Sequence, residues 1–261
     1  MKRVILLGIL SGVMLISCLK NDESNPLVAD FSATITGESP NARVVIENNS
    51  KGATNYQWTF GKGASITEST KELPEEFLVD KAGDLSITLI VSNGSEEKEL
   101  TKKISIPGHT AIETYKNLEF GLEAGDTIYG RCFSFETGKM YLDSEINEEN
   151  GSKIHLAFGS MEHVMYYFDC PTDESYNIPN ATETKITNWE RERPISVSDF
   201  DSMVDDRLLS GLTIEHTEES FLNGSIPHTV LFEISSGRKG VIKTRVVNSS
   251  RLLVDIKVQK Y

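Results

Sequence analysis

The sequence is poor in the residues and motifs from which catalytic and metal sites are usually built. It contains five histidines and three cysteines, and no histidine lies beside a cysteine at the spacing of a zinc site. His-Glu-x-x-His, Gly-x-Ser-x-Gly and Gly-x-x-x-x-Gly-Lys motifs are all missing. Glu162-His163 and Glu215-His216 are adjacent acid–base pairs, but neighbours on a strand point to opposite faces. We therefore expect a protein that is not an enzyme and holds no metal and no cofactor.

Positive charge is also scarce. The chain carries 26 basic and 39 acidic residues, which gives a formal net charge of -13 at pH 7. A protein this acidic is repelled by phosphate backbones, so nucleic acid is excluded as an expected partner.

Long apolar runs are lacking as well. The longest extends from Val4 to Ile16 and follows Lys2 and Arg3. As a helix it would rise only about 20 Å, too short for a hydrocarbon core of roughly 30 Å. A basic start and a short apolar stretch are typical of a secretory signal.

This run ends in Leu15-Ile16-Ser17-Cys18, which resembles the lipobox of bacterial lipoproteins. The resemblance implies a signal peptide over residues 1–17, lipidation at Cys18, a membrane partner reached through the lipid, and a polar tether over residues 18–26. Lys20-Asn21-Asp22-Glu23 resembles the acidic signal that sends lipoproteins to the cell surface in some Gram-negative gut bacteria. The implied location is the outer membrane, facing the cell exterior, with a periplasmic-facing anchor as the alternative.

The two other cysteines allow two interpretations. Outside the cytoplasm, Cys132 and Cys170 can form a disulfide, which would stabilise the fold by roughly 3–4 kcal/mol in the chain-entropy model. Two buried free thiols are the alternative.

Residues 27–106 show short strand patterns separated by turn residues. The clearest runs from Leu85 to Val91, where apolar residues occupy every second position, and Asn93-Gly94 then suits a hairpin turn. Six or seven short strands in eighty residues predict an immunoglobulin-like β-sandwich.

Two motifs in this region resemble the polycystic-kidney-disease-type (PKD) domains. They are Tyr56-Gln57-Trp58-Thr59-Phe60-Gly61-Lys62-Gly63 and the later segment from Ala82 to Leu89. Thr59 and Lys62 stand where many members have Asp, so no acidic function of those positions is implied. The resemblance implies a spacer or interaction module, with Trp58 and Phe60 packed between the sheets.

Residues 107–261 read as a separate β-rich domain that begins after the strand-breaking Pro107-Gly108. The pattern predicts a C-terminal antiparallel meander joined by short polar links. The expected strands are Tyr129–Phe135, Lys139–Leu142, Ile154–Phe158, Val164–Phe168, Thr229–Ile234, Val241–Val247 and Leu252–Val258. The whole chain is thus expected to be mainly all-β, a sandwich followed by a β-rich domain with one short helix.

The expected helix runs from Asp199 to Ser210, with Ser196 or Ser198 as its cap. Phe200, Val204 and Leu208 form one apolar stripe, which leaves the aspartates of this segment (Asp201, Asp205 and Asp206) facing mainly water. The segment lacks the glycine and glutamate of an EF-hand loop, so no metal is expected there.

The layout of this domain also resembles the C-terminal domains of uncharacterised surface lipoproteins from the same bacteria. The similar segments are a strand from Phe133 to Tyr141 and the Phe200-Asp201 pair in the helix. This resemblance assigns no activity.

The candidate binding residues are Tyr167, Asp169 and Trp189. Alternation along the strand places Tyr167 and Asp169 on one face and Phe168 in the core. Exposed aromatic faces with nearby carboxylates are what a sugar site requires. We therefore predict a glycan-binding module. The alternatives are aromatics that only fill the core, an adhesion or assembly component that binds another surface protein, and an unrecognised glycoside hydrolase, which needs two facing carboxylates.

Overall fold

The computed structural model describes residues 26–189 and 194–261, so Cys18, the predicted signal peptide and most of the predicted tether lie outside it. The fold is mainly β, as the sequence predicts. Every pair of neighbouring strands runs antiparallel. Within the described ranges there is one α-helix, and no helix combines the length and apolar character of a bilayer-spanning segment.

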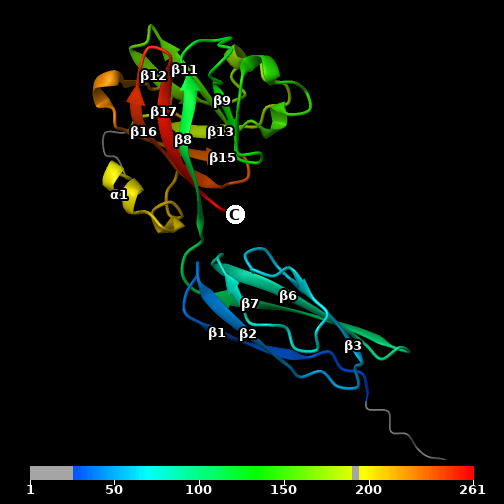
Figure 1. Cartoon of the computed structure of the whole chain (residues 1–261). Helices are drawn as coiled ribbons and strands as arrows, with labels where there is room; N and C mark the ends of the chain where they lie inside the picture. Colours follow the sequence, from blue (N-terminus) through cyan, green and yellow to red (C-terminus); the bar gives the residue numbers. More distant parts are fainter. Residues whose placement is uncertain (1–25, 190–193) are drawn as a thin grey trace, which may run out of the picture.

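The N-terminal lobe is an immunoglobulin-like sandwich of a three-stranded and a four-stranded sheet, drawn in blue to cyan-green in Figure 1. The first sheet has the order β1-β2-β5 and the second the order β4-β3-β6-β7. The strands are β1 (Phe31–Thr36), β2 (Ala42–Asn48), β3 (Asn55–Phe60), β4 (Glu68–Ser69), β5 (Phe77–Val79), β6 (Gly83–Ser92) and β7 (Glu97–Ile106).

Trp58 lies at the centre of the sandwich core. Its ring meets that of Phe31 edge-on at a centroid distance of 5.3 Å, and its indole N–H donates to the Lys71 carbonyl at 3.0 Å. Gly63 adopts φ +100°, and a Cβ there would lie 2.5 Å from Cβ of Lys81. Glycine is therefore required at this turn.

The C-terminal lobe consists of two five-stranded sheets that pack face to face. Their orders are β10-β9-β11-β12-β14 and β13-β15-β16-β17-β8. The strands are β8 (Ile112–Gly121), β9 (Cys132–Ser134), β10 (Lys139–Tyr141), β11 (Leu156–Met161), β12 (Met165–Asp169), β13 (Thr184–Thr187), β14 (Phe221–Leu222), β15 (Thr229–Ile234), β16 (Lys239–Val247) and β17 (Arg251–Gln259). Short 3₁₀ turns occur at Asp143–Glu145, Gly151–Lys153, Glu174–Tyr176, Asp206–Leu208 and Asn223–Ser225.

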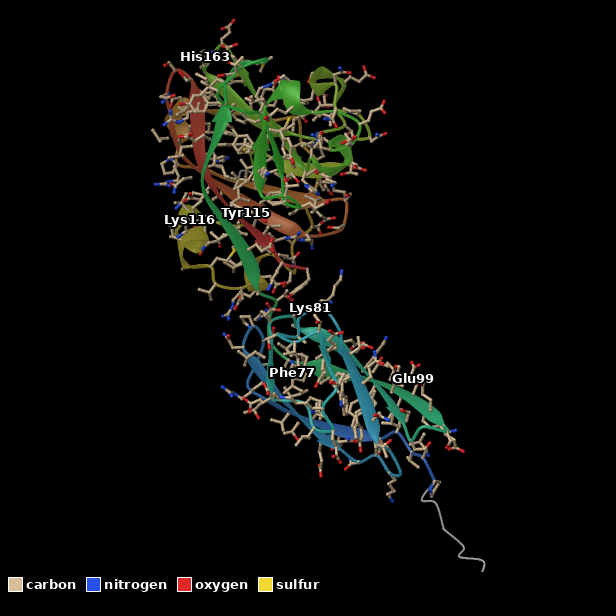
Figure 2. All side chains as sticks on the ribbon, turned by 45° about the vertical axis from the view of Figure 1, so that its right-hand side comes forward. Phe77, Lys81, Glu99, Tyr115, Lys116 and His163 are labelled. Carbon is tan, nitrogen blue, oxygen red and sulfur yellow. The ribbon has the colours of Figure 1, made fainter. Side chains whose placement is uncertain are left out.

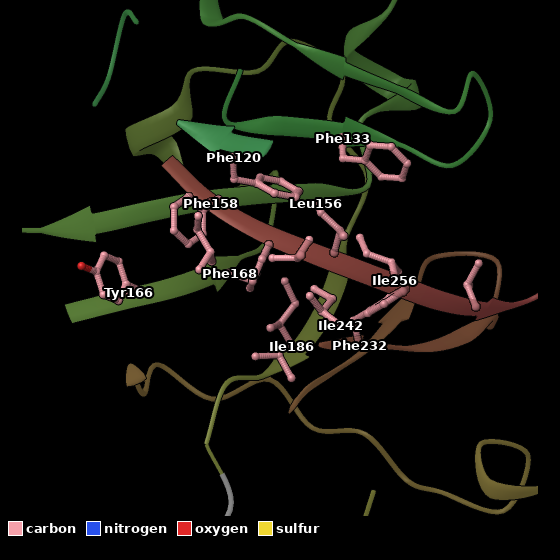
Figure 3. Close-up of a cluster of buried hydrophobic side chains, with 14 of the residues drawn as sticks. Phe120, Phe133, Leu156, Phe158, Tyr166, Phe168, Ile186, Phe232, Ile242 and Ile256 are labelled. Atoms are coloured by element: carbon pink, nitrogen blue, oxygen red, sulfur yellow. The ribbon is translucent and has the colours of Figure 1, made fainter. Parts of the chain in front are cut away.

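The core of this lobe fills the space between the two sheets (Figure 3). Phe120, Phe158 and Phe168 form a mutually contacting aromatic group with centroid distances of 5.1 to 5.6 Å. The predicted meander is confirmed, because β15, β16 and β17 are consecutive antiparallel neighbours. Strands β8, β13 and β14 were not predicted.

The predicted helix is wrong in length. Helix α1 (Val197–Ser202) begins at the expected cap, where the Ser196 hydroxyl accepts from the Asp199 N–H at 3.1 Å, but it ends after six residues. Val204, predicted to belong to the apolar stripe, is 74% exposed. The ammonium of Lys257 explains the early end, because it donates to the carbonyls of the last turn, those of Phe200 at 2.6 Å and Met203 at 2.7 Å.

The prediction that Asp205 and Asp206 face water is also wrong, since both are buried. The Asp206 carboxylate accepts from the Thr110 N–H and from the Gln259 side-chain amide, each at 2.8 Å. These bonds to residues far away in the sequence hold the chain in a bend that a continuous helix could not make.

The two lobes meet at a polar junction near the C-terminus (Figure 1). The Asp80 carboxylate of the sandwich accepts from the Lys260 ammonium at 2.6 Å and from the Tyr261 hydroxyl at 2.7 Å. The His109 N–H donates to the Ser39 carbonyl at 3.1 Å. The last residues of the second lobe therefore tie the first lobe to it, and Lys81 marks this junction in Figure 2.

Candidate functional site

Three adjoining hollows lie along strand β12 and the segment 215–222, and together we call them the β12 groove. The first, of about 270 Å³, is lined by Tyr167, Asp169 and Asn188 among others. The second, of about 380 Å³, shares Asp169, Asp173 and His216 with it. The third, of about 590 Å³, shares Glu218, Glu219 and Ser220 with the first and also includes Trp189.

Strand β12 supplies the wall of the groove by simple alternation. Tyr166 and Phe168 are buried in the core, whereas Tyr167 and Asp169 lie partly exposed on the opposite face. The structure therefore confirms that Phe168 is core and that Tyr167 and Asp169 share a face. Whether that face binds a ligand remains a prediction.

The position of the Tyr167 ring depends on Gly159, its partner across the sheet on β11. A Cβ added to Gly159 would lie 2.4 Å from Cζ and 2.5 Å from the hydroxyl oxygen of Tyr167. The tyrosine ring thus lies flat across the glycine, and a side chain at this position would displace the ring.

Two carboxyl groups of the groove have pKa values shifted in opposite directions. Burial raises the pKa of Asp169, although its carboxylate accepts from the Cys170 N–H at 2.7 Å. Hydrogen bonds from Ser175 lower the pKa of Asp173, and one of them, from the backbone N–H, measures 2.8 Å. Nε2 of His216 lies 3.9 Å from Oδ1 of Asp169. A protonated imidazole would therefore partly offset the negative charge at this end of the groove.

Tyr167 lines the first hollow, whereas Trp189 lines the third. Its ring stacks on that of the buried His228 at a centroid distance of 5.2 Å and an interplanar angle of 17°. It is 38% exposed, and the hollow also includes Leu222, which is 53% exposed. This end of the groove is therefore more apolar than the end near Asp169.

The sequence missed the residues that face Tyr167 from the other side of the groove. His216 and Glu218 belong to a segment without strand or helix periodicity, so no local pattern indicated where they lie. Asp173 was missed as well, although it caps the 3₁₀ turn that follows it.

Cys132 and Cys170 are buried free thiols in the structure. Cys132 and Asp169 both pair with Ala157, from opposite sides, so one strand separates the two cysteines. Neighbouring strands are about 4.8 Å apart, which places β9 and β12 roughly 10 Å apart, beyond the roughly 7 Å that a disulfide spans between Cα atoms. Burial raises the pKa of Cys132 to about 12, and the sulfur of Cys170 accepts from the Thr184 N–H at 3.2 Å.

Across the residues that the structure covers, no group of three or more His, Cys, Asp or Glu side chains is arranged to hold a metal ion. The groove instead offers an aromatic ring, carboxylates and an imidazole. These groups can stack against a ligand and exchange hydrogen bonds with it.

Comparison with known proteins finds similarity to solved structures but no match among family models or curated proteins. A DUF4466 family protein from the bacterium Parabacteroides merdae is similar in structure, with 14% sequence identity and a TM-score of 0.42. The alignment covers 90% of this chain and 99% of that one.

Proposed function

We propose that the protein is a non-enzymatic surface lipoprotein that binds a glycan in the β12 groove. The observation that carries the proposal is the Tyr167 ring, which lies flat on Gly159 beside the partly exposed carboxylate of Asp169. A sugar ring can stack on an aromatic face while its hydroxyls donate to carboxylates.

The charge of the groove indicates which glycans fit. Asp169, Asp173, Glu218 and Glu219 line it, against His216 as the only basic side chain among the lining residues described. Anionic sugars would be repelled by this surface. We therefore expect neutral sugars, whose hydroxyls can donate to these carboxylates.

The first lobe fits the role of a spacer in this proposal. The strand orders β1-β2-β5 and β4-β3-β6-β7 support the resemblance of the sandwich to PKD domains. Lipidation at Cys18 would anchor the chain to the outer membrane, and the sandwich would hold the groove away from the bilayer on the cell exterior.

Two alternatives each have one supporting observation. The exposed Leu222 beside Trp189 suits contact with another protein, as in an adhesion or assembly component. The oppositely shifted pKa values of Asp169 and Asp173 suit a glycoside hydrolase, in which a protonated acid faces an ionised carboxylate. The hydrogen bonds that Asp173 makes as a cap favour a structural role for it.

Affinity gel electrophoresis in a panel of neutral polysaccharides tests the proposal. For a polysaccharide that retards the wild-type chain, we expect Tyr167→Ala to weaken binding by about tenfold, or about 1.4 kcal/mol, and Tyr167→Phe to keep most of it. Tyr56→Ala, at a partly buried tyrosine of the sandwich, is the matched control and should bind normally.

Retardation that is equal in wild type and Tyr167→Ala, with both chains folded by circular dichroism, would overturn the assignment of the groove. Release of reducing sugar by the wild type that stops in Asp169→Asn would instead favour the hydrolase. If the chain binds another surface protein and Leu222→Asp abolishes that binding alone, an adhesion or assembly component would be favoured.

A further inference from the structure

A separate hollow lies on the outer face of the other sheet of the C-terminal lobe. It has a volume of about 370 Å³ and lies where β8, β17 and β16 meet the end of helix α1. Figure 2 labels two neighbours on β8, Tyr115, which packs against the core, and Lys116, which is exposed and lines this hollow. We call it the cationic pocket.

The charge of this pocket opposes that of the whole molecule. Its ionisable lining consists of the cations Lys116, Lys243, Arg245 and Lys257 and the carboxylates Asp201 and Asp255. The cations exceed the carboxylates by two, in a chain whose net charge is -13.

Both carboxylates already have partners. Oδ1 of Asp255 accepts from the Asn117 N–H at 2.9 Å and from Arg245 at 3.3 Å, which fixes the bulge where Asn117 adopts φ 58°. Asp201, on helix α1, forms an ion pair with Lys243. Both carboxylates act on Lys257 through their charge, but neither forms an ion pair with either of the two remaining cations of the pocket.

Those remaining cations are Lys116 and Lys257. Lys116 makes no ion pair with any residue for which the structure gives a position. Lys257 is 9% exposed; its ammonium donates to the backbone carbonyls of Phe200 and Met203 and lies 4.9 Å from the centroid of the Phe200 ring. Burial lowers the pKa of Lys257; the carboxylates of Asp201 and Asp255 act against this, while the positive charges of Lys243 and Lys116 add to it. Like charges held this close repel one another, and a bound anion would relieve the repulsion.

We propose that the cationic pocket binds an oxyanion group, namely a carboxylate, sulfate or phosphate. The group belongs either to a free small molecule or to an acidic polysaccharide. The pocket has the volume of a small-molecule site. Arg245 gives only one of its terminal nitrogens to Asn117 and Asp255, so other N–H groups of its fork are available to pair with two oxygens of an anion. This inference does not depend on glycan binding in the β12 groove.

Isothermal titration calorimetry on the full-length chain at low salt tests the proposal. The probes are inorganic phosphate, sulfate, glucuronate and a sulfated oligosaccharide, with glucose as the neutral probe. We expect at least one anionic probe to bind, glucose not to bind at this pocket, and the affinity to fall as sodium chloride is added. Binding of the small anions identifies a free ligand, and binding of the sulfated oligosaccharide alone identifies a polymer.

Three variants assign the binding to the pocket. Lys116→Gln with Arg245→Gln removes the excess of two charges and should weaken binding by about tenfold or more. Lys98→Gln with Lys103→Gln changes the net charge equally at exposed positions of β7 and should leave binding unchanged. Asp201→Asn removes the closer of the two carboxylates that pair with Lys243, leaving Asp255 at 3.9 Å, and should tighten binding, a result that no folding defect would produce.

No binding of any anionic probe by the wild type would overturn the proposal. Equal binding by the wild type and the Lys116→Gln, Arg245→Gln variant would also overturn it, as would loss of binding in the Lys98→Gln, Lys103→Gln control.

Discussion

Replacing Gly159 with alanine should reshape the β12 groove with little loss of stability. The new Cβ would lie 2.4 Å from Cζ of Tyr167, whereas carbon atoms make favourable contact at about 3.5 Å or more. The ring must therefore move by about 1 Å. It can do so because Tyr167 is only partly buried and faces the hollow.

The stability change should be small because two effects oppose each other. Moving the ring loses part of its packing, while alanine is better than glycine in a strand by roughly 0.5–1 kcal/mol. We expect the free energy of unfolding to change by less than about 1 kcal/mol. Ligand binding should weaken by about tenfold, because the aromatic surface no longer has the position that the groove requires.

Gly240→Ala is the matched control. A Cβ at Gly240 would lie 2.1 Å from Cζ of Phe232 and 2.8 Å from the backbone oxygen of Lys257, and neither atom can move, since Phe232 is fully buried and the oxygen belongs to a central strand. Overpacking of this kind lowers the free energy of unfolding by roughly 1–3 kcal/mol, and we expect Gly240→Ala to lie at the upper end of that range.

Urea denaturation followed by tryptophan fluorescence measures both variants, because Trp58 reports on the sandwich and Trp189 on the second lobe. Only the transition of the second lobe should shift, and only in Gly240→Ala. If Gly159→Ala destabilised the lobe as much as Gly240→Ala, or left ligand binding unchanged, the role given to the Tyr167 ring would be refuted.

Three further outcomes concern Asp206, Asp169 and Cys132. Asp206→Ala removes the acceptor of Thr110 and Gln259, so we expect a loss of about 1–3 kcal/mol and faster hydrogen exchange at the Thr110 amide; unchanged exchange there would contradict this. Because the folded-state pKa of Asp169 is raised, its contribution to stability is largest at low pH and falls as the pH rises above 3.8, the ordinary value. Asp169→Asn should therefore flatten the pH dependence between pH 3 and 7 and be the more stable chain at pH 7, and urea midpoints that stay parallel would contradict it. Iodoacetamide at pH 8 should modify Cys132 only after unfolding, because its pKa is raised to about 12, and native-state modification seen by peptide mass spectrometry would argue against its burial.

Strands were predicted correctly where one face of the strand is buried and the other is exposed. From Leu85 to Val91 the buried residues occupy every second position, as the apolar pattern indicated. Strand β8 was missed because only its last residues are buried and its exposed part carries no apolar alternation. Strand β8 forms because it pairs with β17 along its whole length. Pairing with a distant strand produces no pattern in the local sequence.

The helix was predicted too long because contacts with distant residues prevailed over the local pattern. The cap at Ser196 was visible in the sequence. The end of the helix depends on Lys257, more than fifty residues away, and the bend after it depends on Asp206 binding Thr110 and Gln259. None of these partners can be identified from the spacing of apolar residues.

The candidate site could also be predicted only in part. Alternation along β12 was enough to place Tyr167 and Asp169 on one face. The positions of His216 and Glu218 depend on a segment without periodicity, and the same segment lines the hollow that contains Trp189.

Hydrogen–deuterium exchange with and without a bound neutral oligosaccharide tests the central claim most directly. Glycan binding in the β12 groove predicts slower exchange in residues 165–169 and 215–222, with the sandwich unchanged. Protection confined to the sandwich, or no protection in either segment at a saturating concentration of a ligand that binds, would contradict it.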